Sequence, residues 1–206
     1  MPFLIAITGG SGSGKTLLST ALRQKLPYKT KILSYDNYYR DNTALSMEER
    51  CAINYDSPQS LEEELFIEHL RKLKKNQAIE MPEYDFAEHN RKKRSIHYEP
   101  EEIILCEGIM VMQIPPQYYD MTIFVDASSD VRLSRRILRD VASRGRSVES
   151  VISQYFATVR PMHQKYIAPC KAKADFVFHN DGTQGIDESE LARLISEIIN
   201  KYKKDI

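Results

Sequence analysis

The stretch Gly9-Gly10-Ser11-Gly12-Ser13-Gly14-Lys15-Thr16 decides the fold of this chain. It fits the pattern GxxxxGK[ST], in which glycines let the backbone curl around an anion with its N–H groups pointing inward. A short apolar run, Phe3 to Thr8, precedes the stretch, and a segment expected to be helical begins near Gly14. A helix starting there adds its positive dipole end to the cradle. The pattern and its context therefore predict a phosphate-binding loop between a strand and a helix.

Two side chains of this loop suit a magnesium nucleotide. We expect Lys15 to contact the β- and γ-phosphates and the Thr16 hydroxyl to ligate Mg²⁺. The expected nucleotide site comprises Gly9, Gly10, Ser11, Gly12, Ser13, Gly14, Lys15 and Thr16. A flexible glycine turn that matches by accident is the alternative, and the flanking strand and helix disfavour it. The loop alone does not separate a kinase from a GTPase or an ATP-driven motor.

Outward from the loop, short apolar, β-branched runs alternate with longer amphipathic segments. This alternation predicts an α/β fold, a doubly wound parallel five-stranded sheet with helices on both faces. The expected strands are Phe3 to Thr8, Lys31 to Tyr35, Ile103 to Glu107, Thr122 to Asp126 and Asp175 to His179. The expected helices beyond the loop are Ser60 to Lys75, with a start signal at Ser57-Pro58, then Val131 to Ser143, Glu149 to Tyr166 and Glu188 to Lys203.

The segment from Gln77 to Tyr98 interrupts the alternation, because it is polar, basic and tyrosine-bearing. Two short β-like pieces, around Ile79 to Tyr84 and Ser95 to Tyr98, indicate a small insertion. The 206 residues suffice for one sizeable core and are too few for two ordinary domains. We therefore expect a single domain over residues 1–206.

Charge and cysteine usage exclude several classes of protein. Lys plus Arg and Asp plus Glu balance at 29 each, so no bulk field favours nucleic acid or an anionic membrane. The apolar start, Met1 to Ile7, lacks a basic flank and is too short for a signal peptide or a membrane span. Cys51, Cys106 and Cys170 are far apart and form no CxxC pair, which disfavours disulfides and zinc. We expect a cytoplasmic protein with neither nucleic acid nor membrane as partner.

Two acidic residues follow expected strands, where a doubly wound sheet places its ligands. Asp36 can orient an attacking hydroxyl, accept its proton and lie near Mg²⁺; a turn-forming aspartate is the alternative. Glu107 stands where such loops usually offer an acidic residue to the metal or its water, although aspartate is commoner there. A solvated glutamate at the end of a strand is the alternative. The expected catalytic residues are Asp36 and Lys15, and the expected metal ligands are Thr16, Asp36 and Glu107.

Several stretches together resemble the uridine-cytidine kinase family, within the group of P-loop kinases that includes phosphoribulokinase. The resemblance spans nearly the whole chain and rests on Gly9 to Thr16, Tyr35-Asp36-Asn37-Tyr38-Tyr39, Pro82 to Arg91, Glu107-Gly108-Ile109, and Arg132 to Asp140 continuing to Arg144-Gly145-Arg146. It implies a P-loop kinase domain that uses ATP and Mg²⁺ to phosphorylate the 5′-hydroxyl of uridine or cytidine. GTP stays open as a donor, and a homo-oligomer, a tetramer in similar enzymes, is implied.

The same resemblance implies roles for the acceptor side. Residues 77–98 become the nucleoside-binding insertion, in which Tyr84 and His89 read the pyrimidine edge. A hydroxyl and an imidazole can each donate or accept, so both 4-keto and 4-amino pyrimidines fit. The resemblance also implies that Asp56, Arg136 and Gln154 hold the ribose 2′- and 3′-hydroxyls. A deoxyribose would leave these groups partly unpaired, which predicts a preference for ribonucleosides.

The region 132–146 holds six arginines, several of them three or four residues apart on an expected helix. A solvated helix face is the ordinary interpretation of such a run. The resemblance implies instead a lid in which Arg139, Arg144 and Arg146 close over ATP or the transferring phosphoryl group, with Gly145 as a hinge. A nucleic-acid patch is disfavoured, because interleaved aromatic residues are lacking and the net charge is zero.

The sequence departs from similar enzymes in two places. Asn54-Tyr55-Asp56 is followed by Ser57-Pro58-Gln59-Ser60, where similar uridine kinases commonly carry Asn-Phe-Asp-His-Pro, and Glu88 replaces a small residue. Nucleoside range is therefore less firmly predicted than phosphoryl transfer. Two alternatives stay open: a related kinase acting on another small alcohol, such as pantothenate or nicotinamide riboside, and a regulatory protein that binds a nucleotide without an acceptor.

Overall fold

Five parallel strands form the central sheet of the computed structural model, which describes residues 1–182 and 185–205. They are β1 (Phe3–Thr8), β2 (Thr30–Ser34), β5 (Ile103–Glu107), β6 (Met121–Asp126) and β7 (Phe176–His179). Their order is β2-β5-β1-β6-β7, and every neighbouring pair is parallel. The predicted doubly wound sheet is confirmed, with strand ends within one residue of those expected. One of these small differences matters for the site. Tyr35 was expected to end β2, but it begins a 3₁₀ turn, Tyr35–Tyr38.

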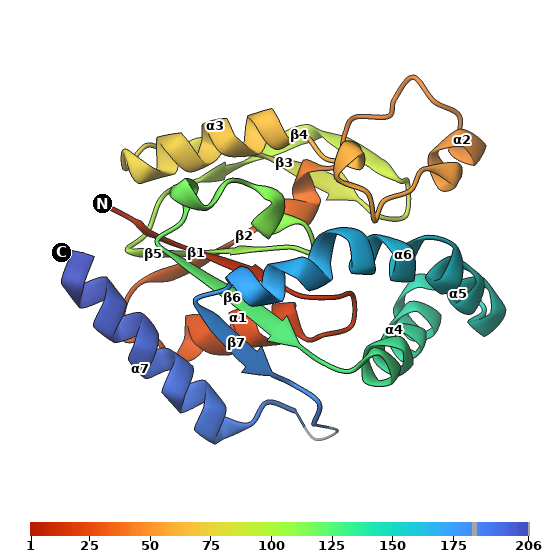
Figure 1. Cartoon of the computed structure of the whole chain (residues 1–206). Coiled ribbons are helices and arrows are strands. Elements are labelled where there is room, and N and C mark those ends of the chain that lie inside the picture. The colour runs from red at the N-terminus through yellow and green to blue at the C-terminus, as the bar shows by residue number, and fades with distance from the viewer. Residues whose placement is uncertain (183–184, 206) are drawn as a thin grey trace.

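Helices cover both faces of the sheet, with α1 (Lys15–Lys25) and α7 (Glu188–Asp205) on one side and α3 (Glu63–Lys74) on the other (Figure 1). The alternation along β1 explains this layering. Phe3, Ile5 and Ile7 pack into the core shared with α1 and α7, whereas Leu4 and Ala6 belong to the core beneath α3. Because both of their faces are buried, β1 and β5 are apolar up to their last residues, Thr8 and Glu107, as central parallel strands between helices must be.

The observed helices differ from the expected bounds, most of all in the segments expected at Ser60 to Lys75 and Glu149 to Tyr166. The Ser57-Pro58 signal opens a 3₁₀ turn, Pro58–Ser60, and the α-helix itself begins at Glu63 rather than Ser60. A further short helix, α2 (Met47–Ala52), was not expected. Its N-terminal Ser46 and Glu49 form a reciprocal capping box, a pattern that the sequence does contain.

The helical region expected at Glu149 to Tyr166 is present, but two π-helical turns interrupt its α-helical pitch. It follows α4 (Ser129–Arg144) and consists of α5 (Val148–Gln154), a π-helical turn Tyr155–Val159, α6 (Arg160–Met162), a second π-helical turn His163–Ile167 and a 3₁₀ stretch Ala168–Lys173. Pro161 lies between the two wide turns and has no backbone N–H to donate. Such single π turns occur frequently at functional sites.

The insertion is an antiparallel hairpin of β3 (Ile79–Asp85) and β4 (Asn90–Tyr98). The expected β-like pieces are confirmed, and the second strand begins earlier than expected. The hairpin packs against the 3₁₀ turn after β2, since Met81 and Tyr84 share a core with Tyr38. The hairpin is thereby joined to the carboxyl edge of the sheet.

Over the described ranges 1–182 and 185–205, every helix is too short or too polar to cross a bilayer. The assignment of residues 1–206 to one domain stays a prediction.

Candidate active site

The phosphate-binding loop folds tightly between β1 and α1. Gly12 and Gly14 have φ angles of 83° and 96°, in the left-handed region that favours glycine. A Cβ on Gly12 would lie 2.3 Å from the carbonyl oxygen of Arg132, and one on Gly14 would lie 2.2 Å from Nδ2 of Asn180. Side chains are therefore excluded at both positions, and the loop delivers the positive end of α1 to the carboxyl edge of the sheet.

Lys15, the first residue of α1, folds back over the loop. Its Nζ donates hydrogen bonds to the carbonyl oxygens of Gly9 at 3.0 Å and Gly10 at 3.2 Å. Burial lowers the pKa of Lys15, whereas the carboxylates of Glu107 and Asp36 raise it. A largely desolvated ammonium at a helix N-terminus suits the binding of anionic phosphates.

Asp36 and Glu107 lie at the same edge of the sheet as the loop. Asp36 belongs to the turn that follows β2, and Glu107 ends the neighbouring strand β5, paired with Ser34. The Glu107 carboxylate accepts hydrogen bonds from the hydroxyls of Thr16 and Ser34, both at 3.3 Å. The structure therefore brings together the carboxylates, the ammonium and the hydroxyl that the sequence singled out.

The electrostatics of this group favour a proton acceptor at Asp36. The pKa of Asp36 is raised to about 6, first by burial and second by the Glu107 carboxylate, and Lys15, Arg144 and Arg139 oppose this shift. A carboxylate whose pKa lies near neutrality is a better general base than an ordinary surface aspartate. Shifts of this kind are also typical of active sites.

Oxygen ligands for a magnesium ion are present at the same point. The Thr16 hydroxyl and the carboxylates of Glu107 and Asp36 are the hard donors that Mg²⁺ prefers. Among the residues that the structure describes, no group of three or more His, Cys, Asp or Glu residues could hold a metal by itself. The arrangement thus fits an ion held by one or two protein groups and completed by nucleotide phosphates and water.

A single buried carboxylate gathers four arginines of the expected lid. Asp140, which is fully buried, accepts a hydrogen bond from Nε of Arg139 at 2.8 Å and lies 3.2 Å from Nη1 of Arg144. Its other oxygen lies 3.6 Å from Nε of Arg136 and 3.8 Å from Nη1 of Arg146. All three expected lid arginines therefore converge on Asp140, although the sequence indicated no partner for them.

Arg136 connects the phosphate loop to the expected ribose site. One of its Nη atoms donates to the Ser11 hydroxyl and the other to Oε1 of Gln154, both at 2.8 Å. Arg136 also lies near Asp56, where burial raises the pKa of the carboxylate and the guanidinium lowers it. The Thr158 hydroxyl donates to Asp56 at 3.2 Å. The structure brings Asp56, Arg136 and Gln154 together and adds Thr158, which the sequence did not indicate.

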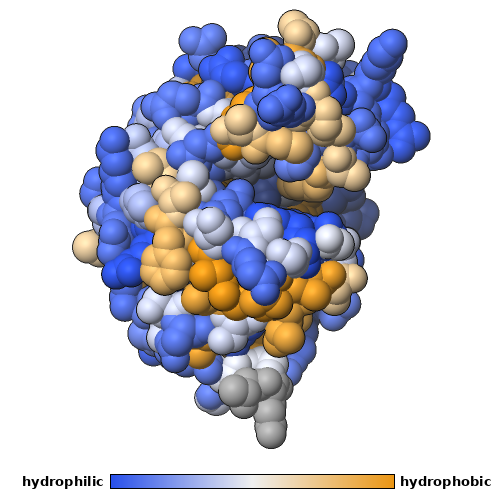
Figure 2. Space-filling view, turned by 90° about the vertical axis from the view of Figure 1, so that its right-hand side faces the viewer, coloured by the Kyte–Doolittle hydropathy of each residue, from blue (hydrophilic) through white to orange (hydrophobic). Residues whose placement is uncertain are grey.

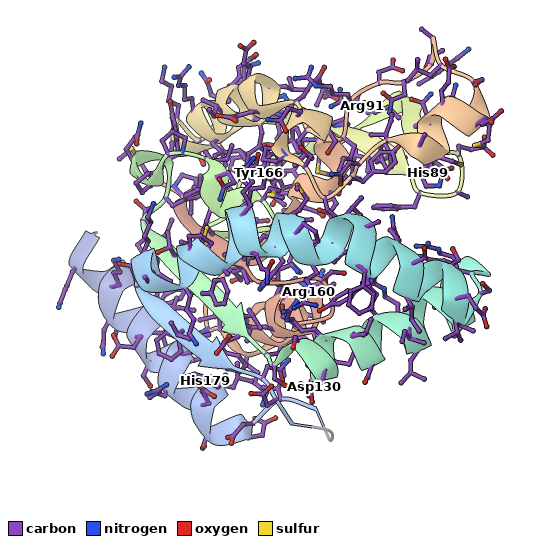
Figure 3. All side chains as sticks on the ribbon, turned by 45° about the vertical axis from the view of Figure 1, so that its right-hand side comes forward. His89, Arg91, Asp130, Arg160, Tyr166 and His179 are labelled. Atoms are coloured by element: carbon purple, nitrogen blue, oxygen red, sulfur yellow. The ribbon has the colours of Figure 1, made fainter. Side chains whose placement is uncertain are left out.

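The expected base-reading residues lie in an aromatic cluster on the hairpin. Tyr84 is buried against the rings of Tyr39 and Phe86, and its hydroxyl has no hydrogen-bond partner among the described residues. His89, labelled in Figure 3, has a φ of 48°, and its ring centroid lies 5.4 Å from that of Tyr55. Such an unpartnered buried hydroxyl is a group that a ligand can satisfy.

The two halves of the site face each other across a hollow. Figure 2 shows this hollow between the part that carries α2 and the hairpin and the part that carries α4 and α5. Arg144 at the end of α4 lies 5.7 Å from the Phe86 ring centroid, so the arginine region and the hairpin meet. An acceptor between them could contact both the loop edge and the aromatic cluster.

Residues 4–187 match the family described as the Phosphoribulokinase / Uridine kinase family. The chain belongs to this family. A protein named uridine kinase from Clostridium botulinum (strain Langeland / NCTC 10281 / Type F) is 42% identical over 203 residues, which cover 97% of this chain and 98% of that protein. Another uridine kinase, from Limosilactobacillus reuteri (strain DSM 20016), is 38% identical over 203 residues, covering 97% and 93%. The resemblance inferred from the sequence is confirmed.

Solved structures of low identity share the fold. Phosphoribulokinase from Rhodobacter spheroides superposes with a TM-score of 0.63 at 18% identity, covering 86% of this chain and 70% of that one. D-glycerate 3-kinase from Cryptococcus neoformans gives a TM-score of 0.62 at 14% identity, covering 90% and 88%. At this level of identity the two comparisons show that the fold is shared.

Proposed function

We propose that the chain transfers the γ-phosphoryl group of ATP to the 5′-hydroxyl of uridine and cytidine, giving UMP and CMP. One observation carries the chemistry: Asp36, whose pKa is raised to about 6, lies at the same sheet edge as the buried Lys15 of the phosphate loop. The name of the curated relatives, uridine kinase, supports the choice of acceptor. The buried, unpartnered hydroxyl of Tyr84 on the hairpin is consistent with this acceptor, since a base can satisfy it.

In the proposed reaction Asp36 orients the nucleoside 5′-hydroxyl and accepts its proton. The oxygen then forms a bond to the γ-phosphorus as the bond between that phosphorus and the β,γ-bridging oxygen breaks, and ADP leaves with that electron pair. Because the attacking and leaving oxygens must be in line, positioning supplies most of the rate. Asp36 returns its proton to water after the monophosphate departs.

Groups on α1 and in the arginine region 132–146 neutralise the negative charge on the phosphates. Lys15 and the start of α1 face the β- and γ-phosphates, and the arginines gathered by Asp140 (Arg139, Arg144 and Arg146) face the transferring group. Thr16, Glu107 and Asp36 would hold Mg²⁺, which would supply further positive charge beside the phosphates.

Recognition of the acceptor is assigned to the hairpin and to the helical region beyond the lid. We assign Tyr84 and His89 to the pyrimidine edge and Asp56, Arg136 and Gln154 to the ribose hydroxyls. The unpartnered hydroxyl of Tyr84 and the link between Arg136 and Gln154 at 2.8 Å support this assignment. A 2′-deoxyribose would leave some of the polar groups of Asp56, Arg136 and Gln154 unpaired, so we expect slower turnover of deoxynucleosides.

A nucleoside panel tests the proposal. The purified chain is incubated with ATP, Mg²⁺ and one acceptor at a time, and both ADP and the monophosphate are quantified. We expect UMP and CMP from uridine and cytidine, and little product from purine nucleosides, nicotinamide riboside or pantothenate. Preferred turnover of one of the last two acceptors would instead assign the chain to the related alcohol kinases, and ATP binding without any acceptor-dependent ADP release would indicate a regulatory nucleotide-binding protein.

Donor range and assembly belong to the same proposal. ATP is the proposed donor, and parallel reactions with GTP establish whether it can replace ATP. By analogy with similar enzymes we also propose a homo-oligomer, a tetramer, which light scattering on the eluted protein measures directly.

A further inference from the structure

Arg91 ties the hairpin to the turn that carries Asp36. It is the second residue of β4, and its side chain is 13% exposed. Nε donates to the carbonyl oxygen of Tyr39 at 2.6 Å, and Nη2 donates to that of Tyr38 at 3.1 Å. Nη1 lies 2.5 Å from the carboxylate of Glu62, just before α3. All three nitrogens of the guanidinium are thereby engaged, two of them with backbone of the segment that follows Asp36.

The same arginine is a direct neighbour of the proposed base-reading residues. In the hairpin register Arg91 pairs with Tyr84, and it follows His89 by two residues (Figure 3). A second tie runs in parallel, because the backbone N–H of Tyr84 donates to Oδ1 of Asn37 at 3.2 Å. The turn Tyr35–Tyr38, which contains Asp36, is thus fastened to the hairpin at both strands.

We propose that Arg91 is a positioning residue that fixes the distance between pyrimidine recognition and the catalytic carboxylate. The inference rests on the proposed function, since it concerns how a nucleoside held by its base presents its 5′-hydroxyl to Asp36. A planar guanidinium that donates along two directions holds two carbonyl groups in one geometry. A lysine offers a single flexible point charge, so it cannot hold both carbonyl groups and Glu62 in the same way.

Loss of the contacts of the Arg91 guanidinium would change where the 5′-hydroxyl of a bound nucleoside lies. The base would still bind to the hairpin, but its 5′-hydroxyl would sample positions away from Asp36. Water would then compete for the γ-phosphoryl group, so ADP would form without UMP. A displacement of about 1 Å in a reacting group can lower the rate of the productive reaction by about 100-fold.

The test compares Arg91→Lys with Arg94→Lys in the full chain. Arg94 is a matched control, because it lies on the same strand and its Nε and Nη2 contact Glu83 within the hairpin alone. For each variant, ADP and UMP are measured in the same reaction with uridine, together with kcat, KM for uridine and the melting temperature. The ratio of ADP to UMP is independent of the fraction of folded protein, so partial unfolding of a variant does not obscure the result.

For Arg91→Lys we expect kcat/KM for uridine to fall about 10- to 100-fold and the ADP:UMP ratio to rise at least about threefold, with Arg94→Lys unchanged. A ratio equal to that of the unmodified chain, at whatever rate, overturns the positioning role and leaves the proposed function intact. Absence of UMP formation by the unmodified chain itself overturns the proposed function and this inference with it. The two failures are therefore distinguished by the unmodified chain.

Discussion

The Thr16 hydroxyl donates a hydrogen bond to Oε2 of Glu107 at 3.3 Å, which joins the first turn of α1 to the end of β5. The other oxygen of Glu107 accepts from Ser34 at 3.3 Å at the end of β2. Three elements of the carboxyl edge therefore meet at one carboxylate. This is the position from which a protein group can orient a magnesium ion or its bound water.

We predict that Glu107→Gln raises the Mg²⁺ concentration needed for half-maximal activity. The amide keeps the size and one acceptor oxygen but loses the negative charge, and loss of such a group typically costs about 10- to 100-fold in metal affinity or activity. Initial rates measured over a series of Mg²⁺ concentrations at saturating ATP and uridine give the shift. Glu102→Gln is the control, because Glu102 contacts the Lys29 backbone at the opposite end of the same strand region. An unchanged Mg²⁺ dependence would contradict the metal role of Glu107.

The pKa of Asp36 predicts the acid limb of the pH–rate profile. As a proton acceptor Asp36 must be ionised, and its pKa is raised to about 6, so kcat/KM should fall tenfold per pH unit below about pH 6. An unshifted aspartate with its ordinary value of 3.8 would leave the rate flat down to about pH 4. The measurement is kcat/KM for uridine from pH 5 to 8 at fixed ionic strength, with saturating ATP. A flat profile across pH 5 to 6 would exclude Asp36 as the titrating base.

The raised pKa of Asp36 also makes the free energy of unfolding depend on pH. Because folding raises the pKa of Asp36, the folded state prefers the protonated carboxyl, and the ionised form destabilises it above about pH 6. Well below pH 3.8 the group is protonated in both states and this destabilisation is absent. Asp36→Asn should therefore raise the free energy of unfolding by about 3 kcal/mol at pH 7.5 and by much less at pH 4, while abolishing UMP formation. Urea titrations at the two pH values check the difference, and lower stability of the variant at pH 7.5 would contradict it.

Much of the sheet was predictable from the sequence, because a strand that is buried on both faces appears as a continuous apolar run. The run Ile103 to Cys106 is apolar at every position, as a strand between two helical layers must be, and all four side chains are buried. Glycine spacing and chain order then placed the phosphate loop, Asp36 and Glu107 at one edge, since parallel strands end on the same side. General rules of backbone geometry were therefore sufficient to predict the sheet and the edge at which the site lies.

The contacts that orient the site depend on tertiary packing and were not predictable. In the sequence, Asp140 is one acidic residue within an arginine-rich helix. Only the folded structure shows that four guanidinium groups converge on its carboxylate. The π-helical turns on either side of Pro161 produce no hydrophobic periodicity that distinguishes them from an α-helix in the sequence. By contrast, α2 could have been found, because Ser46 and Glu49 stand at capping-box spacing.

Tyr55 offers a test of how His89 is held. Its hydroxyl donates to the carbonyl oxygen of Arg50 at 3.0 Å and lies 3.3 Å from that of His89, whose φ of 48° is unusual for a residue with a side chain. We predict that Tyr55→Phe raises KM for uridine about three- to tenfold with little change in kcat, since loss of the hydroxyl removes hydrogen bonds worth about 1 kcal/mol and loosens the turn that carries His89.

Steady-state kinetics with uridine as the varied substrate measure this effect. Tyr118→Phe is the matched control, because the Tyr118 hydroxyl contacts Arg71 on α3 away from the hairpin. A fall in kcat at constant KM would place Tyr55 in the phosphoryl-transfer step and not in base recognition.

The buried carboxylate of Asp140 gives the last prediction. Asp140→Asn keeps the shape of the side chain but leaves Arg136, Arg139, Arg144 and Arg146 without their shared anion. Mutual repulsion among the arginines then spreads the lid, and breaking a buried ion-pair network costs about 3 kcal/mol or more. We expect a lower melting temperature, a KM for ATP raised about tenfold and a reduced kcat, because the transferring phosphoryl group loses prepositioned charge.

Added ATP separates the lid role of Asp140 from a purely structural one. The nucleotide phosphates can replace the missing carboxylate as the anion between the arginines, so saturating Mg-ATP should raise the melting temperature of Asp140→Asn more than that of the unmodified chain. Asp130→Asn on the exposed first turn of α4 is the control and should match the unmodified chain in both measurements. If ATP stabilises Asp140→Asn no more than it stabilises the control, Arg139, Arg144 and Arg146 do not face the nucleotide, and Asp140 serves only the packing of α4.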